Sequence, residues 1–465
     1  MKVLLVYPNA HREIIGYMDL GAIAEPIALE YVAAGARLDG HEVKLLDLRL
    51  HREELDATVR DFQPDVVGVT GYSMHVLRNL EICRRVKELR PQCLTAVGGH
   101  HATLEPVDFH EPEMDYVCVG AGVDSFRKIL RLAEKGETGA VPGAWSRVDG
   151  TFHYGGDPGP YDANQLPMPD RVCTAADRHG YFIDYMKPVA LMRSSVGCPY
   201  RCTFCSLWRI MDGRYYTREL HEVVEEIRDI PEHHVHFADD EPFVNPGRMR
   251  ELAGAIEKAG LQKEYYAYCR VDSFLRDRDL MTQWRDIGLR RLFFGIESVL
   301  ERELVEYNKK TSYHQILEAI EVARDMGIGL FCGFIVNPNY EPEDFDELKR
   351  FIRVNEVSYP SFTIWTPIPG IQDGGTDYSA VITRQPNGRP DWSKFDLQHA
   401  TIPTRLPFDE FMRLYGSLYE VSHFGTTGKA ESVKDAHSID PLTINDEARQ
   451  RAMMMDVARR VANVN

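Results

Sequence analysis

Short apolar runs alternate with helix-like stretches along the first 130 residues, and this alternation constrains the fold more than any other feature. The runs that we predict to be strands are Val3–Tyr7, Val43–Leu46, Val66–Thr70, Leu94–Val97 and Tyr116–Val119. Between them, Pro26–Leu38 and Met74–Leu89 carry apolar residues at intervals of three and four, the helical period. Strands that alternate with helices pair in parallel through right-handed crossovers, so we expect a doubly wound α/β sheet.

Ligands of such sheets bind beyond the carboxyl ends of the strands. The loops at those ends are Pro8–Gly16, Gly71–His75, Gly98–Glu105 and Gly120–Asp124. They are rich in glycine and small polar residues, which lets a large cofactor approach the backbone. No G-x-G-x-x-G follows the first strand, so a dinucleotide is disfavoured.

A second alternation follows a stretch, 136–188, whose many Pro, Gly and Asp residues predict a linker. Its expected strands are Leu191–Ser194, His234–Ala238, Tyr265–Cys269, Arg291–Gly295, Gly329–Ile335 and Ser361–Trp365. Functional groups of repeated βα units gather at the carboxyl ends of the strands. Beyond Pro369, Phe408–Val421 and Asp446–Val461 have helical spacing, so we expect a small helical cap over 371–465.

Three cysteines, Cys198, Cys202 and Cys205, have the spacing C-x3-C-x2-C on one short segment. Thiolates hold iron–sulfur clusters, and a [4Fe–4S] cube normally takes four, so three would leave one iron open to a small molecule. A zinc knuckle or three buried thiols are the alternatives. Zinc would require a fourth Cys or His close by, and none follows Cys205 closely.

Composition narrows the class of protein. With 44% hydrophobic and 27% charged residues, the chain has the composition of an ordinary globular protein. Its net charge of −17 argues against nucleic acid as the main partner. No signal peptide and no apolar run near the ~20 residues of a membrane helix is found, so we expect a cytoplasmic protein. Six further cysteines are scattered and are interpreted as buried hydrophobes: Cys83, Cys93, Cys118, Cys173, Cys269 and Cys332.

The cysteine segment, with Arg201 and Phe204 inside it, resembles the signature of radical S-adenosylmethionine (SAM) enzymes. This resemblance implies a partial (β/α)6 barrel holding a [4Fe–4S] cluster whose open iron binds the amino and carboxylate groups of SAM. Electron transfer then splits SAM into methionine and a 5′-deoxyadenosyl radical. An external electron donor of the flavodoxin or ferredoxin type is also implied.

Polar residues at successive strand ends match the pattern of that family. Asp239 and Asp240 are candidates for the SAM amino group, and Arg270 for its carboxylate. The SAM-binding set implied by the resemblance is Tyr200, Phe204, Asp239, Asp240, Arg270, Gly295, Glu297, Phe334 and Thr366. Any one charged residue alone would more simply form a solvated ion pair; the recurrence at five strand ends favours a pocket.

Near the amino terminus, Val69–Ser73 and Val97–Thr103 resemble the cobalamin-binding domain that precedes many radical SAM domains. The implied cobalamin contacts are Pro8, Asn9, Thr70, Gly71, Tyr72, Ser73, Gly98, Gly99, His100, Thr103, Gly120 and Gly122. The D-x-H-x-x-G of proteins that ligate cobalt from below is missing: His11 stands without the Asp, and the glycine is displaced. We therefore expect no cobalt ligand at His11. Of His100 and His101, one is expected to face the ligand and the other solvent.

Together the resemblances imply a cobalamin-binding domain (1–135), a linker (136–188), a radical SAM barrel (189–370) and the cap (371–465). The chain then looks like a cobalamin-dependent, class B radical SAM methyltransferase, moving methyl from SAM through methylcobalamin to an unactivated carbon of a small-molecule or lipid-like natural product. Arg193–Trp208 and Gly21–Leu48 are similar to hopanoid C-3 methylase-type members. The alternatives are a non-methylating cyclase or ring-contracting enzyme of the same cofactors, and a cobalamin carrier or sensor.

Overall fold

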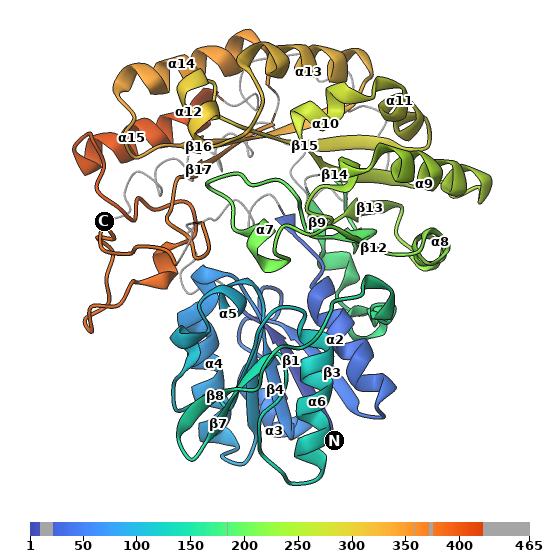
Figure 1. The fold of residues 1–465 in the computed structure, drawn as a ribbon, viewed down its shortest axis with the longest axis vertical. Helices are drawn as coiled ribbons and strands as arrows, with labels where there is room; N and C mark the ends of the chain where they lie inside the picture. The colour runs from blue at the N-terminus through green and yellow to red at the C-terminus, as the bar shows by residue number, and fades with distance from the viewer. Residues whose placement is uncertain (10–21, 184, 358, 372–374, 422–465) are drawn as a thin grey trace.

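The computed structural model describes residues 1–9, 22–183, 185–357, 359–371 and 375–421. It consists of two α/β bodies stacked on each other, with the amino-terminal body below the barrel in Figure 1. His11 and the expected helix Asp446–Val461 lie outside the described residues.

The amino-terminal body is a seven-stranded sheet of order β3-β1-β4-β5-β6-β7-β8. Its parallel strands are β1 (Lys2–Tyr7), β3 (Glu42–Asp47), β4 (Val66–Val69), β5 (Leu94–Val97) and β6 (Tyr116–Cys118). Its helices are α2 (Ile27–Leu38), α3 (Leu55–Phe62), α4 (Val76–Leu89), the short α5 (His100–Leu104) and α6 (Gly122–Glu134). Buried residues pack α3 and α4 against one face and α2 and α6 against the other. The predicted doubly wound sheet is confirmed.

Two antiparallel strands, β7 (Ala144–Val148) and β8 (Thr151–Tyr154), extend this sheet beyond β6. Asp149 and Gly150 both adopt positive φ, 49° and 81°, and so close a tight hairpin between them. The stretch 136–188 was expected to be a linker, and it therefore also supplies strands.

The second body is a six-stranded parallel sheet of order β10-β13-β14-β15-β16-β17, curved as a partial barrel (Figure 1). Its strands are β10 (Val189–Met192), β13 (His234–Phe237), β14 (Glu264–Cys269), β15 (Leu289–Glu297), β16 (Gly329–Val336) and β17 (Tyr359–Ile364). Its outer helices are α8 (Leu220–Asp229), α9 (Pro246–Lys258), α10 (Val271–Arg276), α11 (Arg278–Asp286), α12 (Glu301–Glu306), α13 (Tyr313–Asp325) and α14 (Pro342–Val354). All six predicted strands are present within a few residues.

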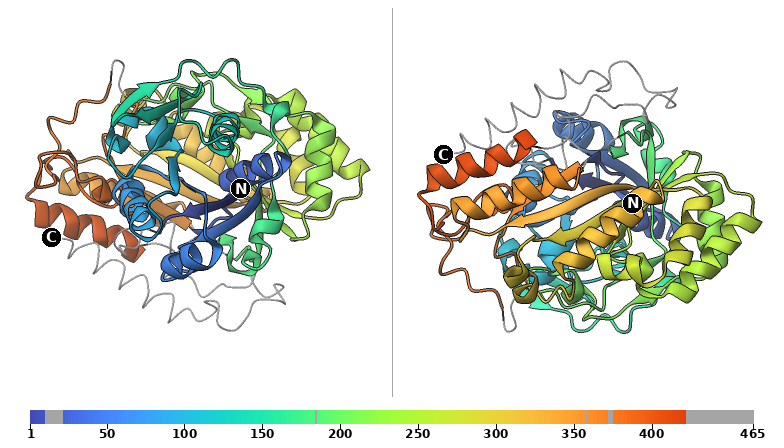
Figure 2. Two further views of the ribbon diagram at one scale, coloured as in Figure 1. Left: turned by 90° about the horizontal axis from the view of Figure 1, so that it is seen from below. Right: turned by 90° about the horizontal axis from the view of Figure 1, so that it is seen from above.

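The carboxyl-terminal part of the described chain contacts both bodies. Helix α15 (Phe408–Leu418) lies beside α14, with the rings of Phe345 and Phe411 5.6 Å apart (Figure 2). Before it, residues 375–407 contain a 3-10 turn, η7 (Trp392–Lys394), and otherwise irregular chain, so the expected helical cap is helical only in part. Trp392 is buried in the core of the amino-terminal body and stacks edge-on against His101.

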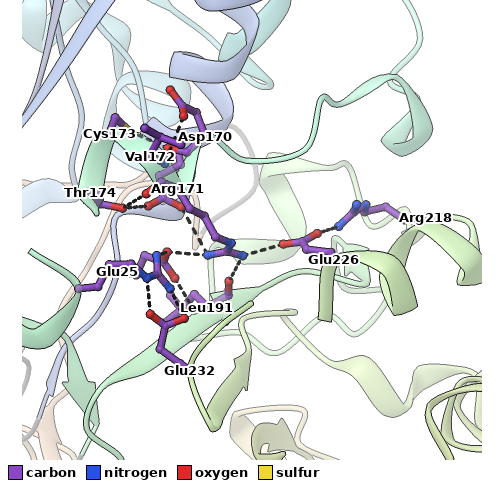
Figure 3. Close-up of polar contacts among 12 residues, drawn as sticks. Glu25, Asp170, Arg171, Val172, Cys173, Thr174, Leu191, Arg218, Glu226 and Glu232 are labelled. Atoms are coloured by element: carbon purple, nitrogen blue, oxygen red, sulfur yellow. Dashed lines mark hydrogen bonds and ion pairs between the residues drawn. The ribbon is translucent and has the colours of Figure 1, made fainter. Parts of the chain in front are cut away.

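A network of buried charges joins the two bodies through the connecting segment (Figure 3). One carboxylate oxygen of Glu25 accepts from both Arg171 and Arg178 at 2.5 Å, and the other accepts from the backbone N–H of Leu191 on β10. Arg171 also bonds Glu226 on α8 at 2.7 Å. Because single buried charges are costly and these are all paired, the network fixes the segment before α2 against the first barrel strand.

Candidate active site

The three cysteines lie on the loop between the hairpin strands β11 (Ser195–Val196) and β12 (Tyr216–Thr217), at the carboxyl end of β10. All three are free thiols, with Cys202 buried and Cys198 and Cys205 half-buried. Three thiols on one short loop are the donor set that an iron–sulfur cluster with one open iron takes, so the residues present fit such a cluster.

Two cations face this loop. Arg270, which follows β14, donates from Nη1 to the Sγ of Cys202 at 3.4 Å and lies over the ring of Tyr200 at 4.0 Å. The ammonium of Lys309 is 5.8 Å from the ring centroid of Phe204 and pairs with Glu297 at 2.8 Å. A cube held by three thiolates carries net negative charge, and these cations offset it. Lys309 was not among the predicted site residues.

Several predicted SAM contacts have other partners. Arg270 also donates hydrogen bonds to the carboxylate of Asp272 and to the carbonyl of Lys309. Its guanidinium therefore has few donors left for a SAM carboxylate. A Cβ on Gly295 would stand 2.3 Å from an oxygen of Glu297, so the glycine leaves room for the Glu297–Lys309 pair. Phe334 is 1% exposed and stacks on Phe362 on the helix side of the sheet, not in the barrel interior.

The two aspartates that follow β13, Asp239 and Asp240, have different hydrogen-bond partners. Asp239 is fully buried and accepts from the backbone N–H and hydroxyl of Ser194 and from the hydroxyl of Ser195, so it braces the chain that leads into the cluster loop. Asp240 is half-buried and accepts from the N–H of Gly197 at 2.9 Å. Burial raises the pKa of Asp240, which indicates a carboxylate short of positive partners. Of the two, Asp240 has the free oxygen.

Glu241 was missed by the sequence reasoning. It is 2% exposed, it accepts from the backbone N–H of Arg270 at 2.9 Å, and burial raises its pKa to about 7. A faint signal was present, because three consecutive acidic residues, Asp239 to Glu241, follow a buried strand. Thr366, by contrast, donates its hydroxyl to the carbonyl of Ile364 at 3.0 Å and is 4% exposed.

The predicted cobalamin loops meet at the carboxyl edge of the amino-terminal sheet, under the barrel (Figure 1). Gly99 has φ 102°, and a Cβ there would stand 2.8 Å from the carbonyl oxygen of Gly71 and from Oγ1 of Thr70. Gly120 has φ 75° with open space where its Cβ would be. Thr103 links these loops, donating to the carbonyl of Gly99 and accepting from the N–H of Gly120. A glycine-lined edge with open space fits a bulky, flat cofactor.

Other predicted cobalamin residues support the loops. Asn9 accepts from Arg78 at 3.0 Å, and Pro8 is buried beside it in sequence. The hydroxyl of Ser73 is 3.0 Å from Nδ1 of His101. Gly98 and Gly122 lie near Cys118, with no conformational requirement for glycine at Gly122.

The expectation for the two histidines was wrong in part. His101 does not face solvent: it is 1% exposed, it bonds Ser73 and Asp108, and it packs against Trp392. His100 is half-buried, and its ring stands edge-on to Tyr72 at 4.7 Å. The chain that covers His101 lies nearly 300 residues away in sequence, so no local pattern could reveal it.

Comparison with known proteins agrees with this geometry. The B12-binding domain family matches residues 18–130, and the radical SAM superfamily matches residues 192–352. Hopanoid C-3 methylase of Methylococcus capsulatus is 30% identical over 451 residues, which cover 93% of this chain and 83% of the relative.

Two solved structures share the fold. The methyltransferase TsrM of Kitasatospora setae, with cobalamin and a [4Fe–4S] cluster bound, has a TM-score of 0.62 at 16% identity, covering 99% of both chains. The cobalamin-dependent enzyme OxsB, with aqua-cobalamin and SAM bound, has a TM-score of 0.67 at 16% identity, covering 99% of this chain and 71% of its own.

The chain belongs to the cobalamin-dependent radical SAM enzymes. Within them it is a homologue of hopanoid C-3 methylase and groups with the methyltransferases, so the non-methylating and carrier alternatives are not favoured. Its cofactors are a [4Fe–4S] cluster, SAM and cobalamin. Over the described residues, we find no helix with the length and apolar character needed to cross a bilayer.

Proposed function

We propose that this protein methylates an unactivated carbon of a small-molecule or lipid-like natural product. The supporting observation is that the barrel and the cobalamin loops face each other (Figure 1). Across this boundary, burial and then the charge of Tyr72, on the amino-terminal body, raise the pKa of Tyr268 on β14. An apolar carbon has no lone pair to attack the methyl of SAM, so both a radical initiator and a separate methyl carrier must reach the same atom.

When bound, the cluster with SAM supplies the radical initiator, and cobalamin supplies the methyl group. We propose that Cys198, Cys202 and Cys205 ligate the cluster. Arg270 and Lys309, which lie beside Cys202, would balance its charge. The rings of Tyr200 and Phe204 lie against these cations and would exclude water from the cluster.

For SAM we propose Asp240 as the partner of the amino group, since Asp239 is occupied by Ser194 and Ser195. Glu297 would accept the ribose hydroxyls while Lys309 holds it in place. Backbone near Gly295, Phe334 and Thr366 would then flank the nucleoside. The glycines of the amino-terminal loops, with Tyr72 and His100 above them, would face the corrin.

The test uses anaerobically reconstituted, reduced protein incubated with SAM carrying a trideuterated methyl group. A methyltransferase forms both S-adenosylhomocysteine and 5′-deoxyadenosine, and replacing the three cysteines with alanine abolishes the 5′-deoxyadenosine and the cluster absorbance. Formation of 5′-deoxyadenosine without any S-adenosylhomocysteine would contradict methyl transfer. Normal turnover by the alanine variant would contradict the cluster assignment.

The electron donor, location and domain limits are also proposals. A small reduced carrier, flavodoxin or ferredoxin, would supply electrons to the cluster. A reducing, cytoplasmic compartment suits nine unpaired cysteines. We propose 1–135, 136–188, 189–370 and 371–465 as the functional segments, with the β7–β8 hairpin assigned to the sheet that it extends.

A further inference from the structure

Arg193 is a cation without a partner at the barrel mouth. It follows β10, whose Val189 and Leu191 point into the barrel while Ala190 and Met192 pack against the helices. Alternation along the strand therefore directs Arg193 inward. Within the described residues its guanidinium makes no hydrogen bond or ion pair, and its Nε is buried without a partner. Arg193 is half-buried, and a buried N–H without an acceptor is unfavourable, which points to an acceptor supplied from outside the chain.

His236 stands beside Arg193 and also has buried nitrogens without hydrogen-bond partners. Its ring is 4% exposed, and neither Nδ1 nor Nε2 has a hydrogen-bond partner. Burial, and then the charge of Arg193, lower the pKa of His236 to about 3, so the imidazole is neutral near pH 7. A neutral imidazole offers one donor and one acceptor, and leaving both unmatched in a buried place is unfavourable. Arg193 and His236 thus present unmet polar groups to one space.

Aromatic rings form the wall of that space. Tyr268 stands 5.2 Å from His236, and Tyr72 stands 4.7 Å from His100. Tyr268 is 36% exposed and Tyr72 41% exposed, yet burial raises the pKa of both, that of Tyr268 to about 12. Both rings are accessible in this structure and lie near the polar groups of Arg193 and His236. We call the group formed by Arg193, His236, Tyr268, Tyr72 and His100 the aromatic chamber.

The carboxylates whose charge reaches Arg193 have hydrogen-bond partners of their own. Burial lowers the pKa of Arg193, and the charges of Asp240, Tyr31, Tyr72 and Asp239 together raise it above its usual value, with Asp240 contributing most among them. No salt bridge joins Arg193 to Asp240, and Asp240 already accepts from Gly197 of the cluster loop. Arg270, the residue first expected to bind a carboxylate, is committed to Asp272 and to Cys202. The unpaired cation of the aromatic chamber is Arg193.

We propose that the methylation substrate carries a single oxyanion, a carboxylate or a phosphate ester, which Arg193 binds, while its flat apolar body lies against Tyr268. This inference rests on the proposed function and names its substrate class. The planar fork of a guanidinium matches a carboxylate in two parallel hydrogen bonds, and aromatic rings favour a flat apolar partner. His236 binds a neutral polar group of the same molecule. Anchoring the anion fixes which carbon faces both cofactors.

The experiment measures binding of three probes to the reconstituted full-length protein by equilibrium dialysis: 2-naphthoate, its neutral amide, and 2-naphthyl phosphate. The wild type is expected to bind at least one of the two anions about tenfold or more tighter than the amide, since a charge-assisted bond is lost in the amide. Arg193→Gln is expected to bind all three alike, and Arg193→Lys to recover part of the preference. Arg214→Gln removes an exposed arginine from the cluster loop and should leave the preference intact.

Equal binding of acid, phosphate and amide by the wild type overturns the proposal, as does an unchanged preference in Arg193→Gln. Tighter binding of 2-naphthoate indicates a carboxylate substrate, and tighter binding of 2-naphthyl phosphate indicates a phosphate ester. SAM cleavage without probe is measured in parallel. If Arg193→Gln stops forming 5′-deoxyadenosine while keeping its cluster, Arg193 serves SAM and the inference fails. If the wild type never forms S-adenosylhomocysteine but retains the anion preference, the proposed function fails instead.

Discussion

Glu30, on α2, is a buried carboxyl group whose protonation should set the pH dependence of stability. It is fully buried, and one oxygen accepts from the hydroxyl of Thr174 at 2.5 Å. Burial and the negative charge of Glu25 raise the pKa of Glu30 to about 9, and the opposing charge of Arg171 does not offset them. The group is therefore protonated in the folded protein at pH 7 and ionised in the unfolded chain.

The direction of the pH dependence of stability follows from this difference between the folded and unfolded states. A carboxyl whose folded pKa lies above its unfolded value of 4.5 stabilises the fold fully below pH 4.5, and its contribution falls as pH rises toward 9. The loss is about 1.4 kcal/mol per pH unit, so roughly 3 kcal/mol disappears between about pH 6 and pH 8. Glu30→Gln has the same shape and cannot ionise, so the variant should lose this dependence and become more stable than wild type above about pH 7.

The assay is urea unfolding followed by circular dichroism at several pH values, for wild type and Glu30→Gln side by side. Other titrating groups are common to both proteins, so the difference between the two curves isolates Glu30. Parallel curves over the whole range would refute the reasoning, because Glu30 would then be ionised when folded. Thr174→Val tests whether the hydroxyl matters, and it should lower stability at every pH.

The remaining predictions concern the cobalamin loops and the segment that covers them. Gly99→Ala places a Cβ 2.8 Å from Gly71 at φ 102°, and strain plus overlap of about 2–5 kcal/mol should lower cobalamin content measured by absorbance. Gly40→Ala, at φ 84° with no neighbour, is the matched control and should keep its cobalamin; equal losses in both would show that backbone strain alone matters. Trp392→Ala should cost about 3–5 kcal/mol in urea unfolding, since the ring fills the core beside His101, and a loss under about 1 kcal/mol would mean the segment is not part of that core.

The strand–helix rhythm allowed both sheets to be predicted, because it depends on local periodicity. Strands such as Val3–Tyr7 and Gly329–Ile335 are near-continuous apolar runs, as parallel strands covered on both faces must be. The β7–β8 hairpin was not foreseen, since its strands are short and sit among Pro and Gly residues. Its pairing with β6 is decided by contact with the finished sheet.

Side-chain roles were harder to predict because they depend on which face of a strand a residue occupies and on distant neighbours. Phe334 looked like a pocket residue, but the alternation of β16 places Phe331 toward the barrel interior and turns Phe334 to the helices. Arg270 was predicted to bind the SAM carboxylate, yet its Nη1 donates to the Sγ of Cys202, which lies 68 residues earlier in the sequence.

Hydrophobic periodicity and cysteine spacing act over a few residues, so the two α/β bodies and the loop with three thiols could be predicted from the chain alone. Which charged groups have partners could be seen only in the folded protein. Asp239 accepts hydrogen bonds from two serines, whereas the Nε of Arg193 has no partner among the residues that the structure describes. The reason is physical: pairing of charges depends on distance and burial, which exist only once both bodies have folded against each other.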